Sequence, residues 1–162
     1  MLTPDRKKLR SLALIMAKIH AVPSAIFLRL IEIESAWNPW ATRYEPTFKR
    51  IYELPDNRLT TTRLTEDTHQ RTSWGLCQVM GYTARVLGHP GPLPALCDPA
   101  INLDLGAVYL HQLYDQAPSI PTWRWALNAY NHSERWTQIN LKWARGGYIE
   151  QYTNELAGLG EA

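Results

Sequence analysis

The residues Phe27-Leu-Arg-Leu-Ile-Glu-Ile-Glu-Ser35 predict an amphipathic helix whose apolar face ends in a carboxylic acid. Residues three and four apart share a helix face, so one face starts at Phe27 and reaches Glu34 through Leu30. Asn38-Pro39 then stops the helix, because the position before a proline disfavours helical backbone. A carboxyl group at the end of an apolar stripe loses hydration, and this raises its pKa toward the value that a general acid needs. Glu34 is therefore a candidate acid catalyst; the alternative is a boundary residue brought to the core edge by helix phase.

The composition is that of a globular domain. With 162 residues the chain has the size of one domain, and 45% of it is hydrophobic and 20% charged. The chain has seven Trp and eight Tyr but only two Phe. Amphipathic aromatic side chains of this kind suit a groove that stacks sugars or bases, and they equally suit ordinary core packing. A net charge of +2 is too small to indicate a nucleic-acid partner, and no apolar run is long enough to span a membrane.

The N-terminus imitates a signal peptide, because Arg6-Lys-Lys-Leu-Arg10 precedes an apolar run. Lys18 and His20 interrupt that run early. We expect instead a structural helix from about Thr3, its N-cap, to His20, with Pro4 at the first helical position. The residues with core-facing helical spacing are Leu12, Ile15, Met16 and Ile19.

The two cysteines, Cys77 and Cys97, fit no metal motif, and we expect neither a metal nor another cofactor. A disulfide between them is one alternative. Two small buried thiols are the interpretation that we favour.

The pattern along the chain predicts a mainly α fold, a single domain over residues 1–162 with six to eight helices. The expected helices are Thr3–His20, Ser24–Trp37, Thr65–Gln70, Gly81–Gly88, Asp98 to about Leu113, Thr122–Asn131, Trp136–Arg145 and Tyr148–Ala157. An excursion at about 46–71 interrupts them, and within it residues 49–62 can form a small hairpin or an irregular loop. Long connections of this kind are often lids or binding loops.

Four short motifs follow one another in a fixed order. They are Glu34-Ser35 with Asn38-Pro39, then Gly75-Leu-Cys-Gln78, then Ala129-Tyr-Asn131, and finally Tyr148. Together they resemble the ordered signatures of soluble-type lytic transglycosylases, relatives of goose-type lysozyme. The segment from Asp98-Pro99 to Leu110 is similar to a helix of that family, and the resemblance covers about Ser24 to Leu156. Arg43-Tyr-Glu-Pro46 resembles phage and mobile-element members.

The resemblance implies a lysozyme-like helical domain that cleaves peptidoglycan glycan strands. Glu34 would be the only acid and base. It would protonate the glycosidic oxygen between N-acetylmuramic acid and N-acetylglucosamine, and then take the proton of the muramic C6 hydroxyl as that oxygen closes a 1,6-anhydro ring. This needs no second carboxylate, unlike two-carboxylate glycosidases.

The same resemblance implies roles for the other motif residues. Ser35 would hold the helix end, and Gln78 would hydrogen-bond sugar or orient the site. Tyr130, near enough to influence Glu34, and Asn131 would line the cleft, and Tyr148 would close its opposite wall.

The sequence departs from the family pattern in three places. Cys77 replaces the usual Met, and His132-Ser133 stands where a Gly is common. The long segment after Glu34 holds further acids, and in goose-type lysozymes acids of this region help water attack. These acids are Glu45, Glu53, Asp56, Glu66 and Asp67. Glu45 is the best candidate for such a role, or for contacting substrate; the alternative is a turn residue bonded to Arg43 or to a backbone amide.

Two other functions stay open. One is a peptidoglycan or chitin hydrolase, and the other is a non-catalytic glycan-binding or phage structural module. A binding module has no need of a desolvated acid, which favours an enzyme. We expect a monomer acting on the bacterial cell wall from the periplasm, as a phage-encoded endolysin, a virion component or part of a larger protein.

Overall fold

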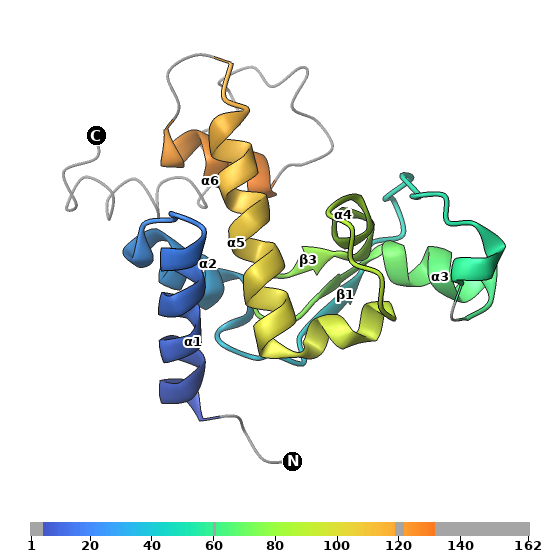
Figure 1. Cartoon of the computed structure of the whole chain (residues 1–162), viewed down its shortest axis with the longest axis horizontal. Coiled ribbons are helices and arrows are strands. Elements are labelled where there is room, and N and C mark those ends of the chain that lie inside the picture. The colour runs from blue at the N-terminus through green and yellow to red at the C-terminus, as the bar shows by residue number, and fades with distance from the viewer. Residues whose placement is uncertain (1–4, 60, 119–121, 132–162) are drawn as a thin grey trace. The chain divides into compact units, whose positions relative to one another are not determined.

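The computed structural model describes residues 5–59, 61–118 and 122–131 (Figure 1). The chain divides into two compact units, Met1–Val108 and Tyr109–Ala162, and each is described by itself. Within the described residues there are six α-helices, two short 3-10 helices and one small sheet, so the expected mainly α fold is confirmed. The expected helices at 136–145 and 148–157 lie outside these residues.

The elements follow one another in the order shown in Figure 1. They are α1 (Arg6–Ile19), α2 (Ser24–Ser35), β1 (Thr42–Tyr44), η1 (Asp56–Arg58), α3 (Arg63–Gln70), β2 (Thr72–Trp74), β3 (Val79–Met80), α4 (Gly81–Val86), η2 (Leu93–Cys97), α5 (Pro99–Asp115) and α6 (Trp123–Asn131).

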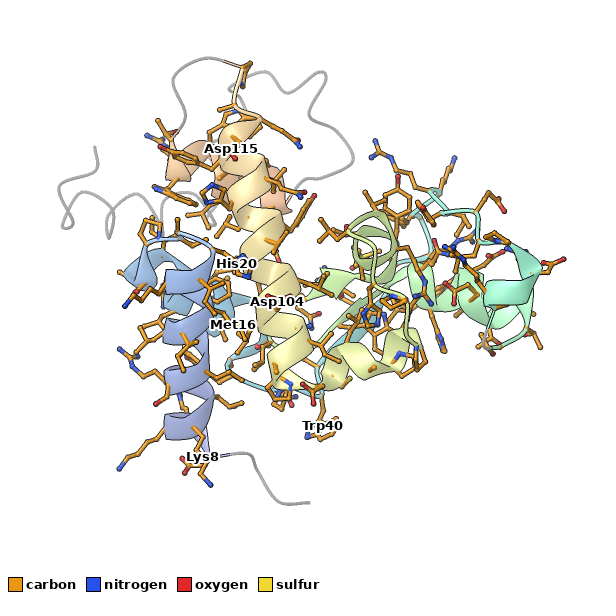
Figure 2. All side chains as sticks on the ribbon, viewed as in Figure 1. Lys8, Met16, His20, Trp40, Asp104 and Asp115 are labelled. Atoms are coloured by element: carbon orange, nitrogen blue, oxygen red, sulfur yellow. The ribbon has the colours of Figure 1, made fainter. Side chains whose placement is uncertain are left out.

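Helix α1 differs from the expectation at its start. Its N-cap is Asp5 rather than Thr3, because the Asp5 carboxylate accepts a hydrogen bond from the Lys7 backbone N–H at 2.9 Å. At its other end, His20 Nε2 lies 2.7 Å from Asp104 Oδ1 of α5 (Figure 2). This contact connects α1 to α5 within the first unit.

The buried face of α1 was also predicted wrongly. Leu9, Ala13 and Ala17 are buried, whereas Ile15 and Ile19 are 53% and 64% exposed. Helix α1 packs on α2, and the distance between two packed helices depends on the side chains at their contact. Two of the three buried residues of α1 are alanines, so its buried face is made mostly of small side chains, and the larger isoleucines lie on another face.

The sheet has the order β1-β2-β3, and both pairs are antiparallel. Thr42 pairs with Trp74, and Trp74 in turn pairs with Val79. The hairpin considered for residues 49–62 is absent from the described part of that segment, which contains η1 and irregular backbone. The strands instead flank the excursion, so the sheet holds its two ends together.

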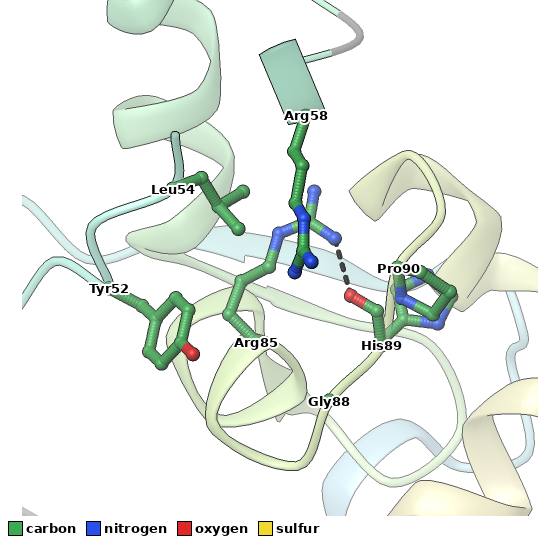
Figure 3. A pocket seen from close by; sticks show the side chains of 7 residues that line it. All are labelled: Tyr52, Leu54, Arg58, Arg85, Gly88, His89 and Pro90. Atoms are coloured by element: carbon green, nitrogen blue, oxygen red, sulfur yellow. Dashed lines mark hydrogen bonds between the residues drawn. The ribbon is translucent and has the colours of Figure 1, made fainter. Parts of the chain in front are cut away.

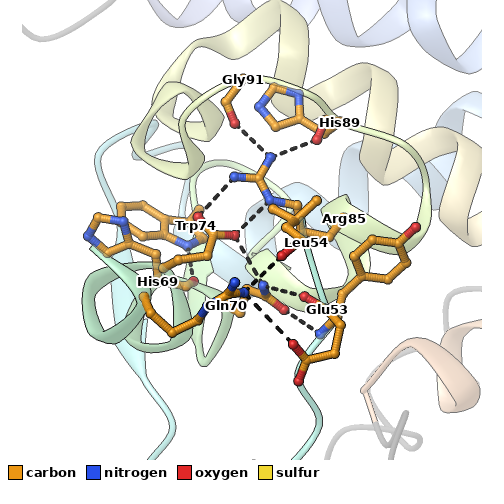
Figure 4. A network of polar contacts seen from close by, with 11 residues as sticks. Glu53, Leu54, His69, Gln70, Trp74, Arg85, His89 and Gly91 are labelled. Carbon is orange, nitrogen blue, oxygen red and sulfur yellow. Dashed lines mark hydrogen bonds and ion pairs between the residues drawn. The ribbon is translucent and has the colours of Figure 1, made fainter. Parts of the chain in front are cut away.

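A buried ion pair anchors the excursion to α4 (Figure 4). Arg85 is 4% exposed and Glu66 is 1% exposed. Arg85 Nε donates to Glu66 Oε1 at 2.8 Å, and Nη2 donates to Oε2 at 3.1 Å. Burial by itself raises the pKa of Glu66, but the hydrogen bond and charge of Arg85, with smaller contributions from Gln70 and His69, outweigh it and lower the pKa. Glu66 is therefore a charged structural residue.

Gln70 extends this network to the excursion backbone (Figure 4). Its Nε2 donates to Glu66 Oε1 at 3.1 Å and to the Tyr52 carbonyl at 3.0 Å, and its Oε1 accepts from the Tyr52 N–H at 2.7 Å. The side chain therefore bonds both backbone groups of one excursion residue. Because Gln70 is fully buried, these bonds give the irregular segment a fixed position on α3.

In the second unit, apolar side chains of α6 and of the C-terminal part of α5 are buried. They are Leu110, Leu113, Ala126, Leu127, Ala129 and Tyr130. Tyr114 stacks on Trp123 with ring centroids 4.3 Å apart.

Candidate active site

Glu34 lies in the last turn of α2, half-buried, and the helix ends at the next residue. Ala36 and Trp37 both have left-handed backbone, with φ of 49° and 67°, and the Ala36 N–H donates to the Glu32 carbonyl at 3.0 Å. Left-handed residues close a helix. The helix therefore ends before Asn38-Pro39, which we had expected to stop it.

Ser35 connects this helix end to the turn between β2 and β3. Its hydroxyl lies 2.8 Å from the carbonyl oxygen of Leu76 and 3.2 Å from that of Ile31, and it can donate to either. The bond to Leu76 joins the first and second sequence motifs directly. The expected role of Ser35 in holding the helix end stays a prediction.

Asn102, a fully buried residue of α5, fixes the turn at residues 75–78 through hydrogen bonds to its backbone. Its Oδ1 accepts from the Cys77 N–H at 2.7 Å, and its Nδ2 donates to the carbonyls of Trp74 at 2.8 Å and Leu96 at 2.9 Å. Gly75 has φ of +70°, and an added Cβ would lie 2.5 Å from Asn102 Nδ2. Glycine is required here by both the backbone conformation and the close approach of Asn102.

Gln78 uses its amide group inside the protein. Its Nε2 donates to the carbonyls of Ala41 at 3.0 Å and Gly75 at 2.9 Å, and its Oε1 accepts from the Ser73 hydroxyl at 2.9 Å. The amide therefore joins β2 to the backbone of Gly75 in the turn and of Ala41 before β1. Both expected roles of Gln78, orienting the site and a hydrogen bond to sugar, stay predictions.

Glu34 and the same turn are electrostatically coupled. Cys77 is fully buried in the turn, and burial, followed by the negative charge of Glu34, raises the pKa of its thiol well above the usual range. Both cysteines are free thiols, and Cys97 is only partly buried. The negative charge of Glu34 therefore raises the pKa of a thiol in the same turn that Ser35 contacts.

The acids of the long segment after Glu34 have different partners. Glu45 forms an ion pair with Arg43, and its N–H donates to the Arg71 carbonyl at 2.8 Å, as in the turn-residue alternative. Glu66 is enclosed in its ion pair with Arg85. Such an enclosed carboxylate has no access to a water at a sugar ring, so we exclude Glu66 as a second acid.

The three remaining predicted site residues belong to the second unit, and two of them are described. Tyr130 is 9% exposed on α6 and packs against Tyr109 with ring centroids 5.2 Å apart. Asn131 is exposed at the end of α6. Tyr148 lies outside the described residues. The predicted contact of Tyr130 with Glu34 stays a prediction.

Sequence reasoning missed two residues that build the site. In the sequence Asn102 is one residue of an expected helix, and no pattern assigns a role to Ser73. A polar residue on the buried side of a helix is a usable signal for Asn102, because a buried amide needs partners and a nearby turn can supply them. No local signal identifies Ser73, since its partner Gln78 reaches it only through strand pairing.

Helix α2 thus carries a half-buried acid, Glu34, in its last turn, next to the residue that contacts the turn at 75–78. Within the described ranges, no three side chains of His, Cys, Asp and Glu lie together as a metal site would require. Residues 11–150 match the family model described as Transglycosylase SLT domain. The chain therefore belongs to the SLT transglycosylase family, a peptidoglycan-cleaving lytic transglycosylase family whose members act on the cell wall.

Searches of curated proteins and of solved structures gave no match. None of the described helices combines the length and apolar character needed to cross a membrane.

Proposed function

We propose that this protein cleaves the β-1,4 glycosidic bond between N-acetylmuramic acid and N-acetylglucosamine, with Glu34 as acid and base. The observation that carries the proposal is the junction of α2 with the turn at 75–78. There Ser35 lies 2.8 Å from the Leu76 carbonyl, and the charge of Glu34 acts on the Cys77 thiol. A carboxyl group on a helix end that a second motif holds in place is pre-oriented, as catalysis at a fixed bond requires.

Two proton transfers complete the reaction. The protonated Glu34 first gives its proton to the glycosidic oxygen, and the bond from that oxygen to C1 of the muramic sugar breaks. The carboxylate then takes the proton of the C6 hydroxyl while the C6 oxygen bonds to C1. Glu34 ends protonated again, no water is consumed, and the 1,6-anhydro product is one water lighter than a hydrolysis product.

The other motif residues have supporting roles in this proposal. Ser35 and Gln78 position the acid and the turn, which their bonds inside the protein support. Tyr130, Asn131 and Tyr148 form walls for the sugar. The family match runs from residue 11 to residue 150, so all of these motif residues lie within the matched segment. We propose that it acts as a monomer on the periplasmic side of the wall, with a phage or virion enzyme as one source.

A test compares two carboxyl-to-amide variants of the same helix. Glu34→Gln should abolish clearing of purified sacculi while keeping the wild-type melting temperature, because an amide keeps the size but cannot cycle a proton. Glu32→Gln is the matched control, since Glu32 contacts Arg6 and Trp37 rather than the turn. Clearing by folded Glu34→Gln at near wild-type rate would overturn the assignment.

Hydrolysis is the second candidate, and Glu45 is its specific test. If Glu45 activates water across the sugar ring, then wild type releases reducing-end muramic acid and Glu45→Gln does not. We expect anhydro products from both proteins, although the rate of Glu45→Gln can fall. The ion pair of Glu45 with Arg43 supports a structural role for this acid.

A further inference from the structure

A cavity of about 470 Å³ lies in the first unit, between the excursion and the loop after α4 (Figure 3). The arginines around it are matched in charge by acids, so the cavity shows no preference for an ion of either sign. The charged residues are Arg58, Arg63, Arg85, Glu53, Asp56 and Glu66. The feature of the first unit that bears on catalysis is instead the end of α2.

The chain leaves α2 in an unfavourable backbone conformation. Ala36 and Trp37, the two residues after the helix, have φ of 49° and 67°. Positive φ is uncommon for residues other than glycine, and for a side chain as large as tryptophan it is an outlier. Such a conformation persists only where the surrounding structure enforces it, and it occurs often at functional sites. The contacts that enforce it here therefore bear on Glu34, which lies two residues before Ala36.

A bond between two side chains of this segment encloses Glu34. The indole Nε1 of Trp37 donates to Glu32 Oε2 at 2.6 Å, across a span that contains Glu34 and Ser35. Trp37 is only 6% exposed, so its indole N–H needs a partner inside the protein. The last turn of α2 and its left-handed exit are therefore joined to each other on both sides of the acid.

Arg6 connects the same bond to α1. Its Nη2 donates to the Glu32 oxygen that Trp37 contacts, and its guanidinium carbon lies 5.5 Å from the centroid of the Trp37 ring. A cation at this distance from an indole ring is attracted to the ring face. The Arg6 side chain is 63% exposed, so its contribution is smaller than that of the buried indole.

We propose that Trp37 is a positioning residue for Glu34, acting through Glu32, and that Arg6 reinforces it from α1. While the bond is intact, the last turn of α2 cannot unwind or lengthen without breaking a buried contact, so the carboxyl group keeps one position. A displacement of about 1 Å at a reacting group can lower a rate about a hundredfold. The inference deepens the proposed function and rests on it for the catalytic role of Glu34.

The first test separates the catalytic rate from substrate binding. Trp37→Phe removes the indole N–H and keeps an aromatic ring. It should lower kcat for clearing of purified sacculi about tenfold and leave KM within about twofold of wild type. Trp40→Phe is the matched control, since Trp40 is 52% exposed and makes no bond to Glu32 in the described part of the chain. Glu32→Gln differs from Trp37→Phe because it keeps an oxygen that accepts from the indole.

Amide hydrogen exchange, followed by NMR in the full chain, tests the helix end without substrate. The Ala36 N–H donates to the Glu32 carbonyl and the Asn38 N–H to the Ser35 carbonyl, each at 3.0 Å. Both amides should exchange about twofold to tenfold faster in Trp37→Phe than in Trp40→Phe, the range expected for the loss of one hydrogen bond.

Each outcome supports or overturns the proposal. A kcat of Trp37→Phe equal to that of Trp40→Phe, a rise in KM at unchanged kcat, or unchanged exchange of both amides would overturn it. If Trp37→Phe does not fold, Arg6→Gln takes its place, because Arg6 is exposed. It should lower kcat and speed both exchange rates about twofold, and wild-type values would overturn the proposal. Faster exchange in Trp37→Phe, with a wild type that leaves sacculi intact, would support the hold on the helix end and remove the proposed function.

Discussion

Removing the Asn102 side chain tests whether the turn at 75–78 positions the acid. Asn102→Ala deletes three hydrogen bonds, to the Cys77 N–H and to the carbonyls of Trp74 and Leu96. A buried group left without a partner costs about 1–3 kcal/mol. Water that enters the vacated space recovers part of this cost, so we expect a loss of about 3 kcal/mol in the free energy of unfolding.

This loss converts into a measurable melting shift. For a chain of this size 1 kcal/mol corresponds to about 2–4 °C, so the melting temperature of Asn102→Ala should fall by about 6–12 °C. The rate of sacculus clearing, measured where the variant is folded, should fall about tenfold to a hundredfold, because the Leu76 carbonyl that meets Ser35 loses its support.

The control for this variant is Gln112→Ala, an exposed position of the same helix, with an expected change within about 0.5 kcal/mol. A melting temperature of Asn102→Ala within about a degree of that of Gln112→Ala, together with an unchanged rate, would refute the account of the turn.

Three further predictions concern the buried pair of Arg85 with Glu66 and the predicted cleft residue Tyr130. Arg85→Met should lower the free energy of unfolding by about 3–5 kcal/mol, measured by urea titration, because it leaves the Glu66 carboxylate buried without its partner. The pKa of Glu66 is lowered from 4.5 in the folded state, so its contribution is fully present above about pH 4.5 and is lost as the pH falls through the lower folded value. Thermal melts should show a shallower loss below that pH in Glu66→Gln than in wild type. Tyr130→Phe should lower the clearing rate more than the melting temperature, and a rate loss explained wholly by melting would favour a packing role.

Much of the helical fold could be predicted from periodicity. The buried face of α2 has Phe27, Leu30 and Ile31 where the spacing placed them, and Glu34 follows at its edge. Helix ends were harder, because the end of α2 depends on the left-handed conformation of Ala36, which is not a usual residue for it. In α1 the spacing of the larger apolar residues predicts the wrong face, because Leu9 and two alanines are the buried residues.

The motif residues of the candidate site could be predicted from the sequence, but the residues that hydrogen-bond them could not. The motif residues Ser35 and Gln78 were identified in order along the chain, yet their partners Leu76 and Ser73 come from strand pairing and turn geometry. The buried pair that includes Arg85 gave no sequence signal, since its partner lies 19 residues away on another helix. Contacts of this kind depend on tertiary structure, which local patterns do not contain.

The mass of the muropeptides released from purified sacculi by the wild-type protein tests the central claim most directly. If Glu34 serves as the only acid and base, the main products end in 1,6-anhydro-N-acetylmuramic acid. Products one water heavier, with a reducing-end muramic acid, would contradict the account and would show that a water, activated by another group, attacks the sugar.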